Sequence, residues 1–286
     1  MGTKKVRASA PGKLMLFGEH AVVYNYPCIV TAVDLRYFVT LEKTQDARIL
    51  VDIPNLKNEQ TEYSIQDIGK LDKYQKGTSF VIAAVKHFYT RYNIASGIHL
   101  STSGPEISYG LGSSSAITVA TIAALASLFE IEINKQEIFE IAYTAVLDVQ
   151  GKGSGFDVAA AVFGGTIYYQ MGGKIIESLD IETLPIQIAY SGEKVSTTNH
   201  IELVSQLRDE YPEIINHIFD LMVNIVEQSK TALITGDWKE VGDLANVNQG
   251  LLASLGVSTN KLANLIYAAR ENGSLGSKLS GAGGGD

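Results

Sequence analysis

The hydrophobic positions in the first third of the chain fall into short runs rich in β-branched and aromatic residues. These runs predict strands at residues 4–10, 29–33, 37–42, 47–53 and 97–101. Pro11 and Gly12 are expected to close the first strand. Residues 54–76 are polar and predict loops with short pieces of structure.

Helical spacing appears in the middle of the chain, where an apolar stripe predicts a helix at residues 78–92. Further helices are predicted at residues 116–129, 135–149 and 156–163, before a strand at 166–169. A strand at residues 186–191 then precedes helices at 201–208, 213–235, 238–255 and 261–272. Strands in the first half and helices in the second indicate an α+β chain. We expect two domains, residues 1–180 and 181–286.

Composition narrows the function classes. The 286 residues are 45% hydrophobic and 19% charged, which is typical of a soluble globular protein with a substantial core. The formal charge of −8 argues against a nucleic-acid partner or an anionic membrane surface. Cys28 is the only cysteine, so an intrachain disulfide is excluded and a cytoplasmic location is favoured. The longest apolar run, ITVATIAALASLF, is too short to span a bilayer.

The stretch PEISYGLGSSSA, residues 105–116, carries the strongest chemical signal. Gly110 and Gly112 permit a tight turn and a close backbone approach, and three serines follow where a helix begins. A helix N-terminus favours an anion, so this stretch is a candidate phosphate cradle. An ordinary capped turn is the alternative. No Lys-Ser or Lys-Thr follows the glycines, which excludes a P-loop, and GxGxxG is not matched.

Two further segments complete a pattern. APGKLMLFGEHAVVY, residues 10–24, gathers Lys13, Glu19, His20 and Tyr24, and KLSGAGGGD at residues 278–286 is a second glycine-rich loop. In this order, the three segments resemble the GHMP kinases over essentially the whole chain. The resemblance implies an N-terminal ribosomal-protein-like domain, a C-terminal ferredoxin-like domain of helices and sheet, and an active site in the cleft between them. Family members continue with another strand, so the second domain is expected to lack its last strand.

The resemblance also implies a reaction. GEHAVVY is similar to the members that phosphorylate mevalonate, whereas GSGFDVAAA and the final GGGD are closer to members acting on phosphomevalonate. We expect ATP-dependent phosphorylation of the primary hydroxyl of mevalonate, giving 5-phosphomevalonate for isoprenoid precursor synthesis, with Mg²⁺ and a possible homodimer. The alternatives are phosphomevalonate kinase or another small-molecule kinase of the family, and a catalytically silent ligand-binding homologue.

Roles for single residues follow from the same resemblance. Asp157 is expected to be the catalytic base, with Lys13 stabilising the developing charge. A helix-capping aspartate and a surface lysine are the plain alternatives. The residues assigned to the acceptor substrate are Glu19, His20, Tyr24, Ser154 and Thr197. For Tyr24, packing in the core is the alternative.

The nucleotide is expected to bind the glycine–serine stretch. The residues assigned to ATP are Pro105, Gly110, Leu111, Gly112, Ser113, Ser114 and Ser115. Ser114 is expected to hold Mg²⁺, although an extra serine leaves Ser113 and Ser115 as alternatives. The usual second metal ligand of the family is a glutamate whose position here falls on Val146, and the nearby Asp148 is expected to point off another face of its helix.

Overall fold

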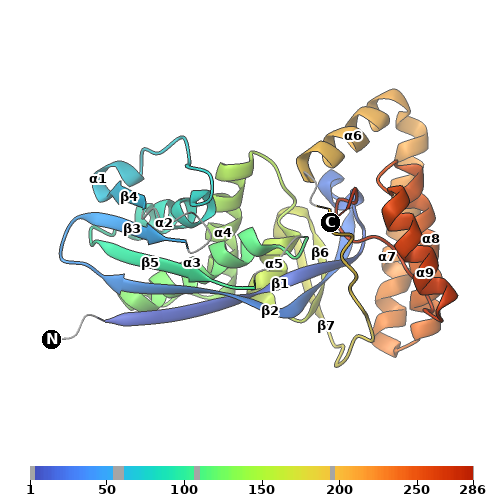
Figure 1. Ribbon diagram of the computed structural model, residues 1–286, viewed down its shortest axis with the longest axis horizontal. Coiled ribbons are helices and arrows are strands. Elements are labelled where there is room, and N and C mark those ends of the chain that lie inside the picture. The colour runs from blue at the N-terminus through green and yellow to red at the C-terminus, as the bar shows by residue number, and fades with distance from the viewer. Residues whose placement is uncertain (1–3, 54–60, 106–109, 194–196, 286) are drawn as a thin grey trace. The chain divides into compact units, whose positions relative to one another are not determined.

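The computed structural model of the protein describes residues 4–53, 61–105, 110–193 and 197–285 (Figure 1). The chain forms two compact units, and both are discontinuous in sequence. The first unit is Met1–Lys13 with Ala32–Gly164, and the second is Leu14–Thr31 with Gly165–Asp286. The domain limits 1–180 and 181–286 stay a prediction.

The two long N-terminal strands differ from expectation. β1 (Lys5–Phe17) continues through Pro11 and Gly12, so the predicted closure there is wrong. In the part of the chain that the structure describes, β1 pairs with β2 and with no other strand. Such an edge strand tolerates a proline, because the N–H that proline lacks is not needed on the unpaired side. β2 (Pro27–Lys43) is likewise one strand, where the sequence predicted two.

The sheet of the first unit runs in the order β4-β3-β5-β2. β3 (Arg48–Asp52) and β5 (Ile98–Ser103) are parallel, with Ile49 opposite Ile98. β4 (Thr61–Ser64) pairs antiparallel with β3, and β2 pairs antiparallel with β5. The predicted strands at 47–53 and 97–101 are therefore confirmed.

The first unit also contains the helices α1 (Ile65–Ile68), α2 (Ser79–Tyr92), α3 (Ser113–Phe129), α4 (Lys135–Gln150) and α5 (Phe156–Phe163). α2, α3 and α4 pack on one another, and α5 packs on α3 and α4. α4 begins with a capping box between Asn134 and Glu137. α3 starts three residues before the predicted 116, so its first turn holds all three serines.

In the second unit, the start of β2 pairs with β6 (Thr166–Gln170), which pairs with β7 (Ile175–Leu179). The short helices η1 (Ala21–Tyr24) and η2 (Met171–Gly173) flank these strands. β7 was not predicted, and the strand predicted at 186–191 is wrong. Ile186, Ile188 and Tyr190 lie exposed in irregular chain, so their β-branched and aromatic character does not mark a strand.

The second unit ends in the helices α6 (Thr197–Glu210), α7 (Pro212–Thr235), α8 (Trp238–Ser254) and α9 (Asn260–Glu271). Their core surrounds the fully buried ring of Phe219 and includes Ala21 and Leu279 from opposite ends of the chain. The α+β class is confirmed. Within the described ranges, no helix has the length and apolar character needed to cross a bilayer.

Candidate functional site

The glycine–serine loop ends in the N-terminus of α3. Gly112 caps the helix with φ 73°, and Ala116 N donates the first helical hydrogen bond to its carbonyl. The first turn of a helix leaves N–H groups without intrahelical partners, which suits an anion. Of the predicted cradle, residues 106–109 lie outside the described residues, whereas Pro105 and residues 110–115 lie within them.

Lys13 lies against this loop rather than on the surface. Its backbone N–H donates to Leu111 O at 2.8 Å and its Nζ donates to Gly110 O at 2.9 Å. The side chain is buried, and Nζ stands 5.1 Å from the ring centroid of Phe156 at the start of α5. The ammonium group is therefore held between the loop and the residue that precedes Asp157.

Glycine is required at two positions where the chain is crowded around Lys13. A Cβ on Gly112 would lie 2.8 Å from Lys13 Cγ, in addition to needing a positive φ. A Cβ on Gly12 would lie 2.7 Å from the carbonyl oxygen of Leu111. The Pro-Gly pair of β1 thus lets the strand continue while the loop packs closely on it.

Asp157 lies in the first turn of α5, after the glycine cap Gly155. Its Oδ2 accepts a hydrogen bond from Ser115 Oγ at 2.6 Å, and its Oδ1 accepts from the N–H of Val158 at 3.1 Å. Burial raises the pKa of Tyr143 on α4, and the charge of Asp157 raises that pKa further. The N-termini of α3 and α5 therefore meet at one carboxylate.

Ser154, which the sequence assigned to the acceptor, precedes this turn and is buried. Tyr143 donates from its hydroxyl to the neighbouring Gly153 O at 2.9 Å, which ties α4 to the turn. These contacts place the turn before Asp157 against α4. The acceptor contact of Ser154 stays a prediction.

The predicted metal site has few protein ligands. Val146 is 2% exposed on α4, so the position expected to hold a glutamate is apolar core. Within the described part of the chain, no group of three or more His, Cys, Asp or Glu side chains is arranged to hold a metal ion. A divalent ion beside Ser114 would therefore depend mainly on phosphate and water oxygens.

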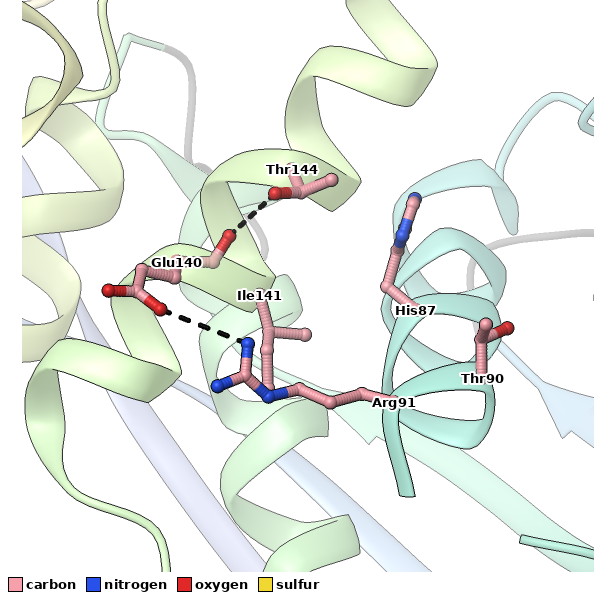
Figure 2. A pocket seen from close by; sticks show the side chains of 6 residues that line it. All are labelled: His87, Thr90, Arg91, Glu140, Ile141 and Thr144. Atoms are coloured by element: carbon pink, nitrogen blue, oxygen red, sulfur yellow. Dashed lines mark hydrogen bonds and ion pairs between the residues drawn. The ribbon is translucent and has the colours of Figure 1, made fainter. Parts of the chain in front are cut away.

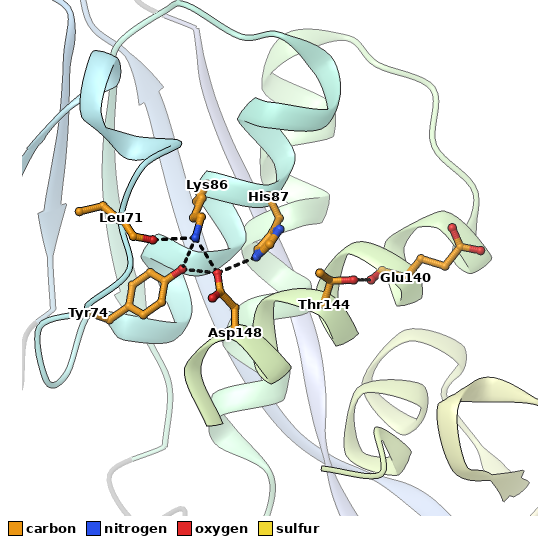
Figure 3. Close-up of polar contacts among 7 residues, drawn as sticks. All are labelled: Leu71, Tyr74, Lys86, His87, Glu140, Thr144 and Asp148. Carbon is orange, nitrogen blue, oxygen red and sulfur yellow. Dashed lines mark hydrogen bonds and ion pairs between the residues drawn. The ribbon is translucent and has the colours of Figure 1, made fainter. Parts of the chain in front are cut away.

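Asp148 does not replace the missing glutamate, because it faces α2 (Figure 3). Its Oδ2 accepts hydrogen bonds from Lys86 Nζ and His87 Nε2, each at 2.9 Å, and from Tyr74. Burial opposes ionisation of this carboxyl, but these donors lower its pKa to about 2. Asp148 thus joins α4 to α2 and to the loop before it, as its predicted direction requires.

A hollow of about 400 Å³ lies between α2 and α4 (Figure 2). It is lined by His87, Thr90, Arg91, Glu140, Ile141 and Thr144. Arg91 reaches toward Glu140, with 3.8 Å between Nη1 and Oε2, and His87 is bonded to Asp148. None of the predicted site residues lines this hollow, and its charges are paired with each other.

In the second unit, Glu19 is fully buried and uses both carboxylate oxygens within the protein. Lys278 donates to Oε1, and Asn248 Nδ2 donates to Oε2 at 3.0 Å. Burial raises the pKa of Glu19, and the positive charge of Lys278 partly offsets that rise. Sequence reasoning missed Asn248, because a polar residue in a helix carries no signal that it is buried. The predicted substrate contact of Glu19 stays untested.

His20 has an unusual backbone conformation, with φ 61°, and a buried ring. Its Nε2–H donates to Ala282 O at 3.0 Å. In the neutral imidazole the proton is therefore on Nε2, and Nδ1 is the nitrogen that can accept a hydrogen bond. Burial lowers the pKa of His20 to about 4, with a further lowering from His200, so the imidazole is neutral at pH 7. Its acceptor contact stays a prediction.

Tyr24 packs in the core, which is the alternative that the sequence left open. Its ring stacks on Phe219 with 4.9 Å between centroids, and the guanidinium of Arg208 lies 4.6 Å above it. Thr197 begins α6, but its side chain lies outside what the structure describes. Substrate binding by these two residues stays a prediction.

The C-terminal glycine-rich loop is fastened to the first segment of the pattern. Ser280 Oγ donates to Met15 O at 2.9 Å, and Leu279 N donates to Gln249 Oε1 at 2.9 Å. Together with the contacts of Lys278 and Ala282, these bonds join stretches from the two ends of the chain. Residues 14–24 of the first segment and the C-terminal glycine-rich loop therefore pack together within the second unit.

Comparison with known proteins agrees with this geometry. The family model of the GHMP kinases N terminal domain matches residues 79–165, and that of the GHMP kinases C terminal matches residues 229–286. The mevalonate kinase of Thermococcus sibiricus is 38% identical over 98% of this chain and 87% of its own length. The first match contains the glycine–serine loop and Asp157, and the second contains the loop of Lys278.

Solved structures show the same fold. The Methanococcus jannaschii mevalonate kinase superposes with a TM-score of 0.81 at 26% identity, covering 99% of this chain and 89% of its own. The L. major mevalonate kinase in complex with R-mevalonate has a TM-score of 0.79 at 25% identity, covering 99% of this chain and 86% of its own. The chain therefore belongs to the GHMP kinase family and has its two-domain α+β fold.

Proposed function

We propose that this chain is an ATP-dependent kinase that phosphorylates the primary hydroxyl of mevalonate, giving 5-phosphomevalonate and ADP. Relatives named mevalonate kinase match it at 38% identity over nearly its full length, which supports this substrate. The observation that carries the chemistry is the arrangement of Lys13, the start of α3 and Asp157 in the first unit.

In the proposed mechanism, Asp157 accepts the proton of the mevalonate hydroxyl. The hydroxyl oxygen attacks the γ-phosphorus of ATP as the bond from that phosphorus to the β,γ-bridging oxygen breaks, and ADP leaves with the bridging oxygen. The ammonium group of Lys13 stabilises negative charge on the attacking oxygen. Positioning and electrostatic stabilisation supply most of the rate gain in this class of reaction.

The residues at the start of α3 fit a triphosphate. Gly110 and Gly112 bring the backbone close, and Ser113 and Ser114 present half-buried side chains in the first turn. Mg²⁺ would be held by the phosphates and Ser114, and it would neutralise phosphate charge. We further propose a cytoplasmic enzyme that forms a homodimer, which light scattering after gel filtration tests.

A coupled assay of ADP release with mevalonate and with 5-phosphomevalonate tests the substrate. We expect turnover with mevalonate. The segments GSGFDVAAA and GGGD favour the rival substrate, and turnover with 5-phosphomevalonate alone would overturn the proposal. Absence of turnover with any candidate hydroxyl acceptor, together with intact ATP binding, would favour the catalytically silent homologue instead.

A further inference from the structure

We infer that Ser115 is a positioning residue for the catalytic base, a role that rests on the proposed function of Asp157. Ser115 is the third serine of the loop and was expected to bind ATP. Its hydroxyl instead donates to Asp157 Oδ2 across 2.6 Å. This bond joins the first turn of α3 to the first turn of α5.

Ser115 is more deeply buried than the two serines that precede it. Ser115 is 1% exposed, whereas Ser113 and Ser114 are half-buried. Successive helical residues project about 100° apart, so the three hydroxyls leave the helix in different directions. Ser113 and Ser114 remain available to phosphate oxygens, and the single proton of Ser115 is committed to the carboxylate.

The contacts of Asp157 fix the orientation of its carboxylate. Oδ1 accepts from Val158 N–H and Oδ2 accepts from Ser115, while the residue as a whole stays half-exposed. Among the described residues, Tyr143 from α4 is close enough for the charge of Asp157 to raise its pKa, and the ammonium of Lys13 lies 5.1 Å from the ring of the preceding Phe156. A carboxylate that accepts one hydrogen bond on each oxygen keeps a fixed orientation, and a fixed orientation within hydrogen-bond reach of the acceptor hydroxyl favours proton removal.

Ser115→Ala should disturb the fold little, because alanine is favoured in a helix and the substitution removes only the hydroxyl. Positioning predicts that kcat falls about 10- to 100-fold, the range for a hydrogen bond to a charged group. The KM for ATP and the Kd for a non-hydrolysable ATP analogue with Mg²⁺ should stay within about twofold of wild type, since no nucleotide contact is removed. A nucleotide-binding role would instead weaken the Kd while sparing kcat, and that result would overturn the inference.

Thr121→Val is the matched control. Thr121 is also fully buried on α3, but its hydroxyl donates only to Ile117 O of its own helix, at 2.8 Å. Its kcat should stay near that of wild type. An equal loss of kcat in both variants would mean that any buried hydroxyl of α3 matters, and Ser115 would then have no special role.

A double-mutant cycle with Asp157→Asn completes the test. Because Ser115 acts through Asp157, Ser115→Ala should lower kcat no further once the carboxylate is gone. A full additional loss in the double variant would overturn the inference. If wild type turns over no acceptor, the proposed function fails by itself. The same cycle can also be measured on the thermal midpoint of unfolding, which needs no turnover. Non-additive shifts of the midpoint would support the contact between Ser115 and Asp157, and additive shifts would exclude it.

Discussion

Glu19 and Lys278 form a buried ion pair although 259 positions separate them in the chain. The pair lies in the second unit, where Asn248 provides the other donor to the carboxylate. One residue comes from the segment GEHAVVY and the other from the C-terminal glycine-rich loop. The two segments therefore depend on one another for their structure, whatever they contribute to substrate binding.

Removing one partner of this pair should destabilise the protein strongly. Lys278→Met leaves Glu19 buried without its cation, and the free energy of unfolding should fall by about 3–5 kcal/mol in a urea titration. Glu19→Gln/Lys278→Met should recover much of that loss. Lys239→Met is the control, because the pair of Lys239 with Asp243 is exposed and should change stability by less than about 1 kcal/mol. A small loss for Lys278→Met would contradict the buried pair.

The free energy of unfolding should fall as the pH becomes acidic, because His20 is held neutral in the folded protein. Its pKa in the folded protein is about 4, below the ordinary 6.5, so the unfolded chain binds more protons between these values. The contribution of His20 is fully present above pH 6.5 and is lost progressively as pH falls toward 4, by up to about 3 kcal/mol.

Urea unfolding from pH 7.5 to pH 4 measures this loss. His20→Asn should flatten the slope, because it removes the imidazole that titrates in this pH range. His217→Gln, at an exposed position of α7, should keep the wild-type slope. If wild type and His20→Asn share one slope, His20 is not the group responsible.

Removing the proposed base should separate chemistry from binding. Asp157→Asn keeps the shape of the side chain but cannot accept the substrate proton, so turnover should fall about 10²- to 10⁴-fold. The Kd for a fluorescent ATP analogue should stay near that of wild type. Asp209→Asn, at an exposed position of α6, controls for loss of a carboxylate. Wild-type turnover in Asp157→Asn would show that another group removes the proton.

Two glycines with the same φ of 73° give a matched test of the loop. Gly112→Ala and Gly151→Ala should both lose about 1–2 kcal/mol of stability from backbone strain. A Cβ at Gly151 meets nothing within 4 Å, whereas at Gly112 it meets Lys13 Cγ at 2.8 Å. Turnover should therefore collapse only in Gly112→Ala. Equal activity in the two variants would remove Lys13 from the proposed mechanism.

Much of the first unit was predictable because its patterns are local. The apolar stripe of α2 and the small-residue run of α5 are read correctly, and the glycine–serine loop was found as a helix start. The family resemblance gives Lys13 and Asp157 a shared role. The ammonium of Lys13 contacts Gly110 and Phe156, the residue before Asp157, which is consistent with that expectation. Turn chemistry and helical periodicity decide these features within a few residues of sequence.

The errors arise where a distant partner decides the outcome. β1 accommodates Pro11 because, within the described ranges, it pairs with β2 alone, and no local pattern reveals that pairing. Residues 186–191 have strand-like composition, yet Ile188 is 50% exposed and lies in irregular chain. The direction of the Ser115 hydroxyl was not predictable either, because it depends on how α5 packs on α3, and the assignment of Ser115 to ATP stays a prediction.

The discontinuity of the second unit has a consequence for biosynthesis. Leu14–Thr31 is synthesised before the chain with which it packs, which starts at Gly165 and includes the loop of Lys278. At typical translation rates of about 5–20 residues per second, this segment waits roughly 10–50 s for its last partners. During that interval Phe17 and Ile29, which are buried in the finished unit, have no native core to enter. The nascent chain should therefore be a client for chaperones that shield apolar strands until synthesis is complete.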